Sequence, residues 1–222
     1  MKYKKIFISG TNTNVGKTFV TEKIIKLIES KGRLVSPFKP VETGCEKKLS
    51  ELVPYDSTIF YRAINKRISL DKINPYRFLE PISPAAAIKR SRKKIMINNY
   101  VKKIKDLPES DITIIEGAGG LCSPLALDGY NIDLAKKIHA STILVAKDEI
   151  GVINNVILSI SMLKKYKIKT IAIVLNRISM KQPRGMDNYN EIRSLTKIPL
   201  IQVMNKKNNN KEFNKLIKLI TA

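Results

Sequence analysis

Short apolar runs alternate with longer stretches of helical spacing along most of this chain. Residues 5–9 centre on three apolar residues and stop at Gly10, which is typical of a buried strand. Residues 17–30 instead repeat apolar positions every three or four residues, which predicts a helix. The same criteria predict strands at 34–39, 112–115, 141–146, 169–175 and 200–203, and helices at 131–138, 152–166, 188–196 and 211–220.

Strands that alternate with helices form right-handed crossovers and a parallel sheet with helices on both faces. The pattern therefore predicts an α/β fold with a mostly parallel sheet, in a single domain of residues 1–222. Residues 45–105 are less regular and carry one predicted helix near 57–63, so we expect an insertion over the sheet edge. Ligands of such sheets bind where strands end, which makes the residues that follow strands the first candidates for function.

The clearest motif is GTNTNVGKT, residues 10–18, between the first strand and the first helix. This context is that of a phosphate-binding loop: backbone N–H groups face the phosphates, Gly16 allows close approach, Lys17 neutralises charge and Thr18 ligates Mg²⁺. Five residues separate the two glycines where the common pattern has four, so Thr11 stands at the usual first-glycine position. The sequence therefore predicts a P-loop NTPase type of fold that binds ATP with Mg²⁺.

Two further charged residues follow strands. Glu116 comes directly after the strand at 112–115 and is a candidate Mg²⁺ ligand; the alternative is a solvated glutamate at a strand end. Lys39 ends the strand at 34–39, where a second cation would face a substrate anion or the transferred phosphoryl group, although by type it is more often a surface lysine. His139 is the sole histidine and is expected at a helix end, so covalent catalysis through a Ser-His-Asp arrangement is disfavoured.

The net charge of +22 raises the question of nucleic-acid binding. The lysines are scattered through nearly every segment, which favours compositional drift over a specific nucleic-acid function. Cys45 and Cys122 lack metal or redox spacing and are expected to be reduced thiols. No apolar run is long enough for a signal peptide or a membrane span, so we expect a cytoplasmic protein without a membrane partner.

Several motifs occur in a characteristic order: the phosphate loop, KPVETG at 39–44, NPYRF with EPISP at 74–84, EGAGGLCSPL at 116–125 and DEIGVINN at 148–155. Together they resemble the dethiobiotin synthetase family over essentially the whole chain. The resemblance implies a ligase of biotin biosynthesis that closes the ureido ring of dethiobiotin from 7,8-diaminopelargonate and CO₂. It implies a carbamate that ATP phosphorylates to a mixed anhydride, and release of ADP and phosphate.

The resemblance also implies a homodimer in which the partner subunit completes the substrate site. It further assigns roles to individual residues. The resemblance assigns catalysis to Lys17, Lys39 and Thr11. It assigns Mg²⁺ binding to Thr18, Asp56 and Glu116. Substrate binding falls to Thr11, Lys39, Thr43, Gly151, Val152 and Asn154. Nucleotide binding falls to Asn14, Val15, Gly16, Lys17, Thr18, Phe19, Asp56, Glu116, Gly117, Ala118, Gly119, Asn176 and Arg177, with residues 203–205 beside the base.

Two positions depart from the family pattern: Ala85 stands where many members carry histidine, and Arg177 where some carry an acid. Among rivals, a cobyrinate-type amidotransferase synthase would need a glutaminase domain, for which we expect no room. A partitioning-type ATPase that dimerises on DNA is the alternative from another class, because the positive charge would suit it. Its loop usually has a lysine near the first glycine, where this chain has Thr11 and Asn12.

Overall fold

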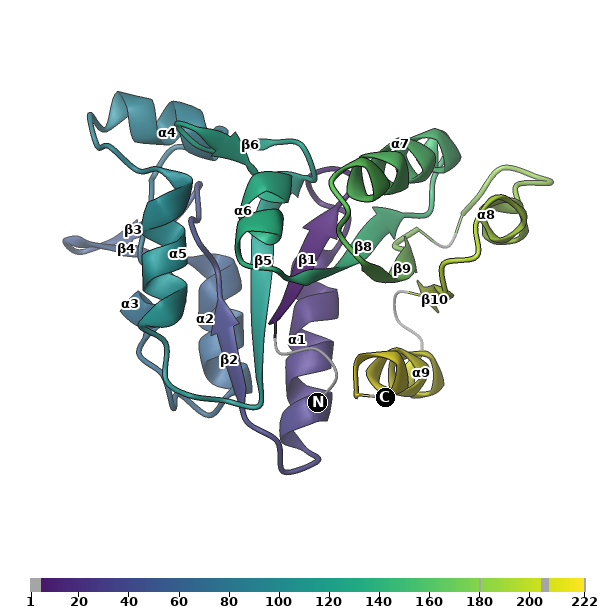
Figure 1. Ribbon diagram of the computed structural model, residues 1–222, viewed down its shortest axis with the longest axis horizontal. Helices are drawn as coiled ribbons and strands as arrows, with labels where there is room; N and C mark the ends of the chain where they lie inside the picture. The colour runs from purple at the N-terminus through teal and green to yellow at the C-terminus, as the bar shows by residue number, and fades with distance from the viewer. Residues whose placement is uncertain (1–4, 180, 205–207, 222) are drawn as a thin grey trace.

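A six-stranded parallel sheet forms the centre of the protein, in the computed structural model that describes residues 5–179, 181–204 and 208–221 (Figure 1). The strand order is β10-β9-β8-β1-β5-β2, and every neighbouring pair runs parallel. The strands are β1 (Lys5–Gly10), β2 (Val35–Phe38), β5 (Ile112–Gly120), β8 (Ser141–Lys147), β9 (Thr170–Arg177) and β10 (Leu200–Met204). The order changes direction around β1, which places the loop after β1 at the switch point where such sheets bind ligands.

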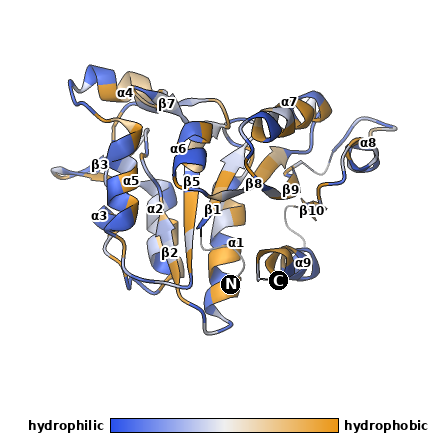
Figure 2. Cartoon of the chain, viewed as in Figure 1, coloured by the Kyte–Doolittle hydropathy of each residue, from blue (hydrophilic) through white to orange (hydrophobic). Residues whose placement is uncertain are grey.

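Helices pack on both faces of this sheet, as Figures 1 and 2 show. Side chains alternate along β1, so Ile6 and Ile8 join one hydrophobic cluster while Phe7 joins another on the opposite face. The first cluster includes buried side chains of α1 (Lys17–Glu29), α2 (Tyr55–Ala63) and α9 (Asn210–Thr221). The other face is covered by α5 (Ile97–Lys105), α6 (Asn131–Lys137), α7 (Val152–Lys165) and α8 (Asn188–Leu195). The predicted α/β class is confirmed.

The predicted strands and helices outside residues 45–105 are all present, with ends within about two residues of the prediction except in one strand. The exception is β5, which was predicted to stop at Ile115 but continues to Gly120. Glu116 is therefore inside the strand rather than at its end. The strand continues because Gly120 still pairs with Gly10 of β1, after an irregularity in register between Ile8 and Gly10.

Residues 45–105 form the crossover between β2 and β5 and hold more structure than predicted. Besides α2 they contain a hairpin of β3 (Glu46–Lys48) and β4 (Glu51–Val53), and the helices α3 (Leu70–Ile73), α4 (Pro84–Arg90) and α5. The prediction of an irregular segment was wrong for α5, whose buried residues Ile97, Tyr100 and Ile104 follow helical spacing. A second small hairpin, β6 (Pro124–Ala126) with β7 (Gly129–Tyr130), follows β5.

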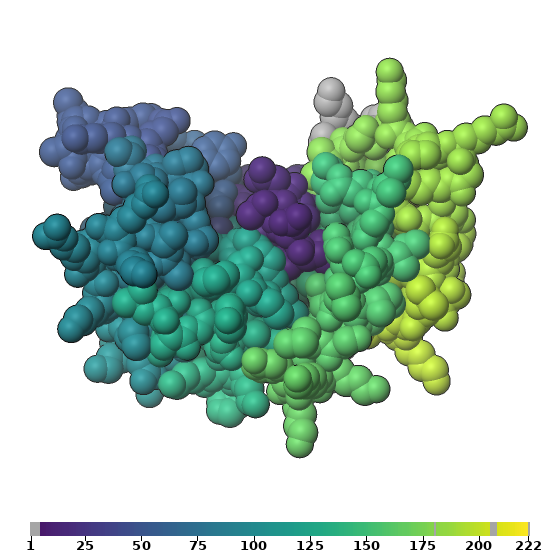
Figure 3. All heavy atoms as spheres, turned by 90° about the horizontal axis from the view of Figure 1, so that it is seen from above, coloured from purple at the N-terminus to yellow at the C-terminus, as the bar shows by residue number. Residues whose placement is uncertain are grey.

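The loop after β1 lies in a depression of the surface. In Figure 3 the purple atoms of the N-terminal region sit between the blue and teal segments on one side and the green and yellow segments on the other. Within the described residues, no helix has the length and apolar character that crossing a bilayer requires. Cys45 is buried and Cys122 is exposed, and both are free thiols, as predicted. His139 is exposed and lies two residues after the end of α6, near a helix end as predicted.

Candidate active site

The phosphate loop turns from β1 into α1 with backbone angles that favour glycine. Gly16 has a φ of 93°, and a Cβ atom there would lie 2.1 Å from the Nδ2 atom of Asn176. That Nδ2 atom donates a hydrogen bond of 2.9 Å to the carbonyl oxygen of Val15, which ties the end of β9 to the loop. Only glycine fits both the backbone angle and the space, so the loop geometry depends on Gly16.

Lys17 opens α1 and folds back over the loop. Its Nζ atom donates a hydrogen bond of 3.1 Å to the carbonyl oxygen of Asn12, and only 7% of the residue is exposed. Burial, together with the nearby positive charge of Lys39, lowers the pKa of Lys17 to about 8. An anion that entered the cleft would stabilise the charged form of this ammonium group. The cleft therefore attracts anionic groups such as phosphates.

Lys39 stands at the centre of the charged cluster. Its Nζ atom lies 2.8 Å from Oδ2 of Asp56, in the first turn of α2, and 2.6 Å from Oε1 of Glu116 in β5. Burial alone would lower the pKa of Lys39, but the two carboxylates outweigh it and raise the pKa above its ordinary value. Lys39 therefore stays charged, and the sequence-based interpretation of a surface lysine is excluded because only 4% of it is exposed.

The two carboxylates differ in their surroundings. Burial disfavours ionisation of Asp56, but the ammonium group of Lys39 lowers the pKa of Asp56 below its ordinary value. Glu116 is fully buried, and this burial raises its pKa above the ordinary value despite the ion pair. Its Oε1 atom also accepts a hydrogen bond of 3.2 Å from Oγ1 of Thr18. Glu116 is thus no solvated strand-end glutamate.

The donor set around Lys39 suits Mg²⁺. Thr18, Asp56 and Glu116 offer only oxygen atoms, and the carboxylates already converge on one cation, the ammonium group of Lys39. No group of three or more His, Cys, Asp or Glu side chains within the described residues could hold a metal ion. A site with two carboxylates and one hydroxyl relies on phosphate oxygens and water for its remaining ligands, as Mg²⁺ sites beside nucleotides do.

Nine of the nineteen predicted site residues line one cleft of about 480 Å³. Glu116 lies beneath it, bonded to Lys39 and Thr18. The cleft also includes Thr13, Val41, Glu42 and Tyr55, which the sequence analysis did not assign. The predicted residues that line it are Asn14, Gly16, Lys17, Thr18, Lys39, Thr43, Asp56, Ala118 and Gly119.

Other predicted residues lie outside the lining of this cleft. The side chain of Val15 is in the hydrophobic core, and that of Phe19 packs edge-on against Phe213 of α9. Val15 can therefore meet a nucleotide only through its main chain, whereas the partly buried Phe19 side chain lines a separate hollow beside α9. Gly117 has no room for a side chain, because a Cβ atom would lie 2.4 Å from Oδ1 of Asn131.

Thr11 faces a second hollow, of about 280 Å³, on the other side of the phosphate loop. This hollow is also lined by residues 120–123 and by Asn155, Leu158, Ser159 and Met162 of α7. Gly151 precedes α7 with a φ of 86°, Val152 is buried and Asn154 is exposed. None of these last three residues lines the cleft of the same chain.

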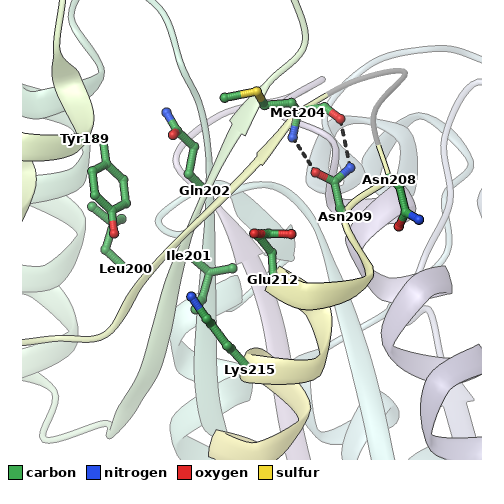
Figure 4. A pocket seen from close by; sticks show the side chains of 9 residues that line it. All are labelled: Tyr189, Leu200, Ile201, Gln202, Met204, Asn208, Asn209, Glu212 and Lys215. Atoms are coloured by element: carbon green, nitrogen blue, oxygen red, sulfur yellow. Dashed lines mark hydrogen bonds between the residues drawn. The ribbon is translucent and has the colours of Figure 1, made fainter.

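The region beyond β9 contains further residues that were predicted to contact the nucleotide. Arg177 pairs with Oδ2 of the buried Asp148, with 3.5 Å between the nearest atoms. A hollow of about 290 Å³ lies beside β10. In Figure 4 the side chain of Asn209, which lines this hollow, bonds to both backbone groups of Met204. Of the residues predicted beside the base, Val203 is fully buried and Asn205 lies outside the described residues.

Three residues that shape the site were missed from the sequence. The Oγ1 atom of Thr21, one turn after Lys17, bonds to Oε2 of Glu116. Asn131 is fully buried and bonds to Ala118 and Gly120, which fixes the turn after Glu116. Glu42 bonds to the start of α2. The sequence feature that could have identified such residues is a polar side chain on an otherwise apolar, buried helix face. Thr21 is an example, because it lies among Val20, Ile24 and Ile25.

Comparison with known proteins gives one consistent result. Residues 4–208 match the protein family described as an AAA domain. The chain is 36% identical over 218 residues to the ATP-dependent dethiobiotin synthetase of Vesicomyosocius okutanii, which covers 98% of this chain and 96% of the relative. It is 32% identical to the protein of the same name from Halalkalibacterium halodurans, over 89% of this chain and 83% of the relative.

Solved structures with the same fold are more distant in sequence. A plasmid partition protein from Borrelia burgdorferi is 15% identical with a TM-score of 0.60, over 98% of both chains. The cell division ATPase MinD of Pyrococcus furiosus is 17% identical with a TM-score of 0.58, again over 98% of both chains. At this level of identity the likeness shows a shared fold alone.

Proposed function

The chain belongs to the family of ATP-dependent dethiobiotin synthetases, and we propose on this premise that its cleft closes the ureido ring of dethiobiotin. The substrates are 7,8-diaminopelargonate, CO₂ and ATP, and the products are dethiobiotin, ADP and phosphate. The observation that carries the proposal is the pair of buried lysines, Lys17 and Lys39, in one cleft with a phosphate loop. Two cations suit two anions, the γ-phosphate and a carbamate.

The reaction needs positioning and charge rather than an enzyme nucleophile. One amine of the substrate adds to CO₂, loses a proton and becomes a carbamate. A carbamate oxygen then attacks the γ-phosphorus, and the bond between that phosphorus and the departing ADP oxygen breaks. Finally the second amine attacks the carbamate carbon, loses a proton and expels phosphate. Lys17 would stabilise the charge on the β- and γ-phosphates, and Lys39 the charge shared by the carbamate and the transferred phosphoryl group.

Thr18, Asp56 and Glu116 would hold Mg²⁺, since they present the hydroxyl and carboxylate oxygens described above. When bound, the ion supplies neutralising charge on the nucleotide phosphates. Other residues of the chain position the phosphates. Gly16 leaves the N-terminal amides of α1 open to phosphate oxygens, and Asn176 holds the loop through its hydrogen bond to Val15. Residues 1–222 would then act as one ATP-binding synthetase domain, working in the cytoplasm.

The base would lie beyond Asn176, toward β10. Asn176 uses Nδ2 to hold the loop, and its Oδ1 atom is of the type that accepts from the amino group of adenine. Arg177 follows Asn176 in β9 and is paired with Asp148, and we propose that it contributes to the choice of nucleotide.

The substrate site is proposed to lie between two copies of the chain. Gly151, Val152 and Asn154 do not line their own cleft, so they would reach a substrate only across an interface. The apolar residues Ile150 and Leu158 flank this segment and are 79% and 60% exposed, as expected of a surface that a second copy covers. Thr11 and Thr43 would contact the substrate from its own subunit.

One coupled assay tests the reaction. ADP release should require the diamine and bicarbonate together, and dethiobiotin should form in equal amount. ATP turnover that proceeds equally without the diamine would contradict the proposal. Lys17→Ala and Lys39→Ala should each slow the reaction by about 10²-fold or more, because each removes preorganised charge.

The shared site can be tested by mixing inactive variants. Lys39→Ala disables the phosphate side of a site, and Asn154→Ala the side given by the partner. If two chains build each site, a mixture of equal amounts of both variants should recover about a quarter of the wild-type activity through mixed dimers. Activity no greater than that of the two variants measured separately would mean that each chain builds its own site.

A further inference from the structure

Glu42 occupies the cleft beside Lys39 and has no role in the function proposed above. It is 6% exposed, and a buried carboxylate is costly unless several donors satisfy it. Here its Oε1 atom accepts a hydrogen bond of 2.7 Å from the backbone N–H of Asp56. Its Oε2 atom accepts from the N–H of Ser57 at 3.1 Å and from the Ser57 hydroxyl at 2.6 Å.

These bonds replace a missing helix cap. Helix α2 starts after Pro54, which offers no side-chain acceptor, so the first N–H groups of the helix have no cap from their own segment. Glu42 satisfies two of them from a position 14 residues earlier in the chain. Its own backbone is fixed in turn, because its N–H donates to Tyr76 and its carbonyl oxygen accepts from Phe78.

The helix turn that Glu42 holds is the turn that carries Asp56. Asp56 is 26% exposed in its side chain and sits in the first turn, where helices fray. The contact of 2.8 Å between Asp56 and Lys39 keeps this carboxylate within the charged cluster only while the start of α2 stays in place. We propose that Glu42 is a positioning residue that fixes the metal-binding carboxylate of Asp56 through the first turn of α2.

The inference rests on the proposed function, because it takes Asp56 as a Mg²⁺ ligand. Its readout is the ratio of ATP affinities with and without Mg²⁺, measured by calorimetry on the full chain with no diamine present. Failure of the synthetase reaction and failure of this inference are therefore separate results. Asp56→Asn should reduce the ratio, and an unchanged ratio in this variant would remove the metal role on which the inference depends.

Glu42→Gln keeps the volume of the side chain but places an NH₂ group against a backbone N–H donor. We expect it to reduce the Mg²⁺ enhancement of ATP affinity by about tenfold, the scale of one lost charge-assisted hydrogen bond. Amide exchange at Asp56 and Ser57 should become faster. Ser57→Ala removes the hydroxyl bond and leaves both N–H bonds, so it should change the ratio much less.

Glu29→Gln is the matched control. Glu29 also accepts from a backbone N–H, that of Val35 at 2.7 Å, and pairs with Arg67, but it lies outside the cleft. It should lower the thermal midpoint without changing the Mg²⁺ ratio. If Glu42→Gln behaves in the same way, with a lower midpoint and a wild-type ratio, Glu42 only braces the fold and the proposal is overturned.

Discussion

Lys17→Met should make the ligand-free protein more stable at neutral pH while it weakens ATP binding. Lys17 is 7% exposed, and burial with the neighbouring Lys39 disfavours its charge. Methionine has a similar length and no charge, so it removes this cost and keeps most of the packing. Nucleotide sites commonly give up stability for function in this way.

The magnitude follows from the shift in pKa. A fall from 10.5 to about 8 corresponds to about 3 kcal/mol, at about 1.4 kcal/mol per pKa unit. The lost hydrogen bond to Asn12 offsets about 1 kcal/mol of this gain. We therefore expect the free energy of unfolding to rise by about 2 kcal/mol at pH 7, to within a factor of two.

The sign of the pH dependence is fixed by the direction of the shift. Below pH 8 both the folded and the unfolded state carry the Lys17 charge, and the folded state bears its full cost. Between about pH 8 and 10.5 the unfolded state binds more protons, so wild-type stability from this group rises with pH. The advantage of Lys17→Met should therefore be largest below pH 8 and should decline toward pH 10.5.

Urea unfolding of both proteins across pH 6.5 to about 10, without nucleotide, measures this difference. Lys23→Met, on the exposed side of the same helix, is the control and should give no such pH-dependent advantage. The reasoning is refuted if Lys17→Met is no more stable than the wild type at pH 7, or if its advantage does not change with pH.

Three further substitutions test the supports of the site. Gly16→Ala should cost about 2 kcal/mol of stability, because of the positive φ and the contact with Asn176, and an unchanged free energy of unfolding in urea would contradict this. Asn131→Ala should lower the free energy of unfolding by about 2–4 kcal/mol and speed amide exchange across residues 118–123. Slow exchange there would show that the turn keeps its structure without the Asn131 side chain. Thr21→Val should slow turnover and weaken Mg²⁺ dependence through Glu116, whereas Thr21→Ser should restore both; equal defects in the two variants would exclude the hydroxyl as the cause.

Binding to DNA separates a metabolic enzyme from the alternative of a DNA-bound ATPase. A steep, ATP-dependent association with DNA at physiological salt would favour that alternative, whereas weak binding that ATP does not change favours a metabolic enzyme. The identities of 15–17% to the partition protein and MinD structures show the fold alone. The net charge of +22 by itself predicts only salt-sensitive, non-specific association.

The sequence by itself determined the order of elements and the phosphate loop. Local periodicity decides whether a segment is a strand or a helix, and the loop motif is contiguous in sequence. Both can therefore be predicted without knowledge of tertiary contacts. It located Lys17, Lys39 and Glu116 because each stands beside a predicted strand or helix end. It failed at α5, where helical spacing was present but lay in a segment interrupted by prolines and charges.

Only the tertiary structure decided what those residues do to one another. The contacts of Lys39 with Asp56 and Glu116 span 17 and 77 residues of sequence, and no local pattern encodes such a distance. The same holds for Glu42 at the start of α2. Glu116 also proved to lie within β5, because pairing with β1 continues the strand through the glycines up to Gly120, where the sequence had suggested a turn. Burial then sets the charge of each group, since the cost of desolvation depends on what the whole fold packs around it.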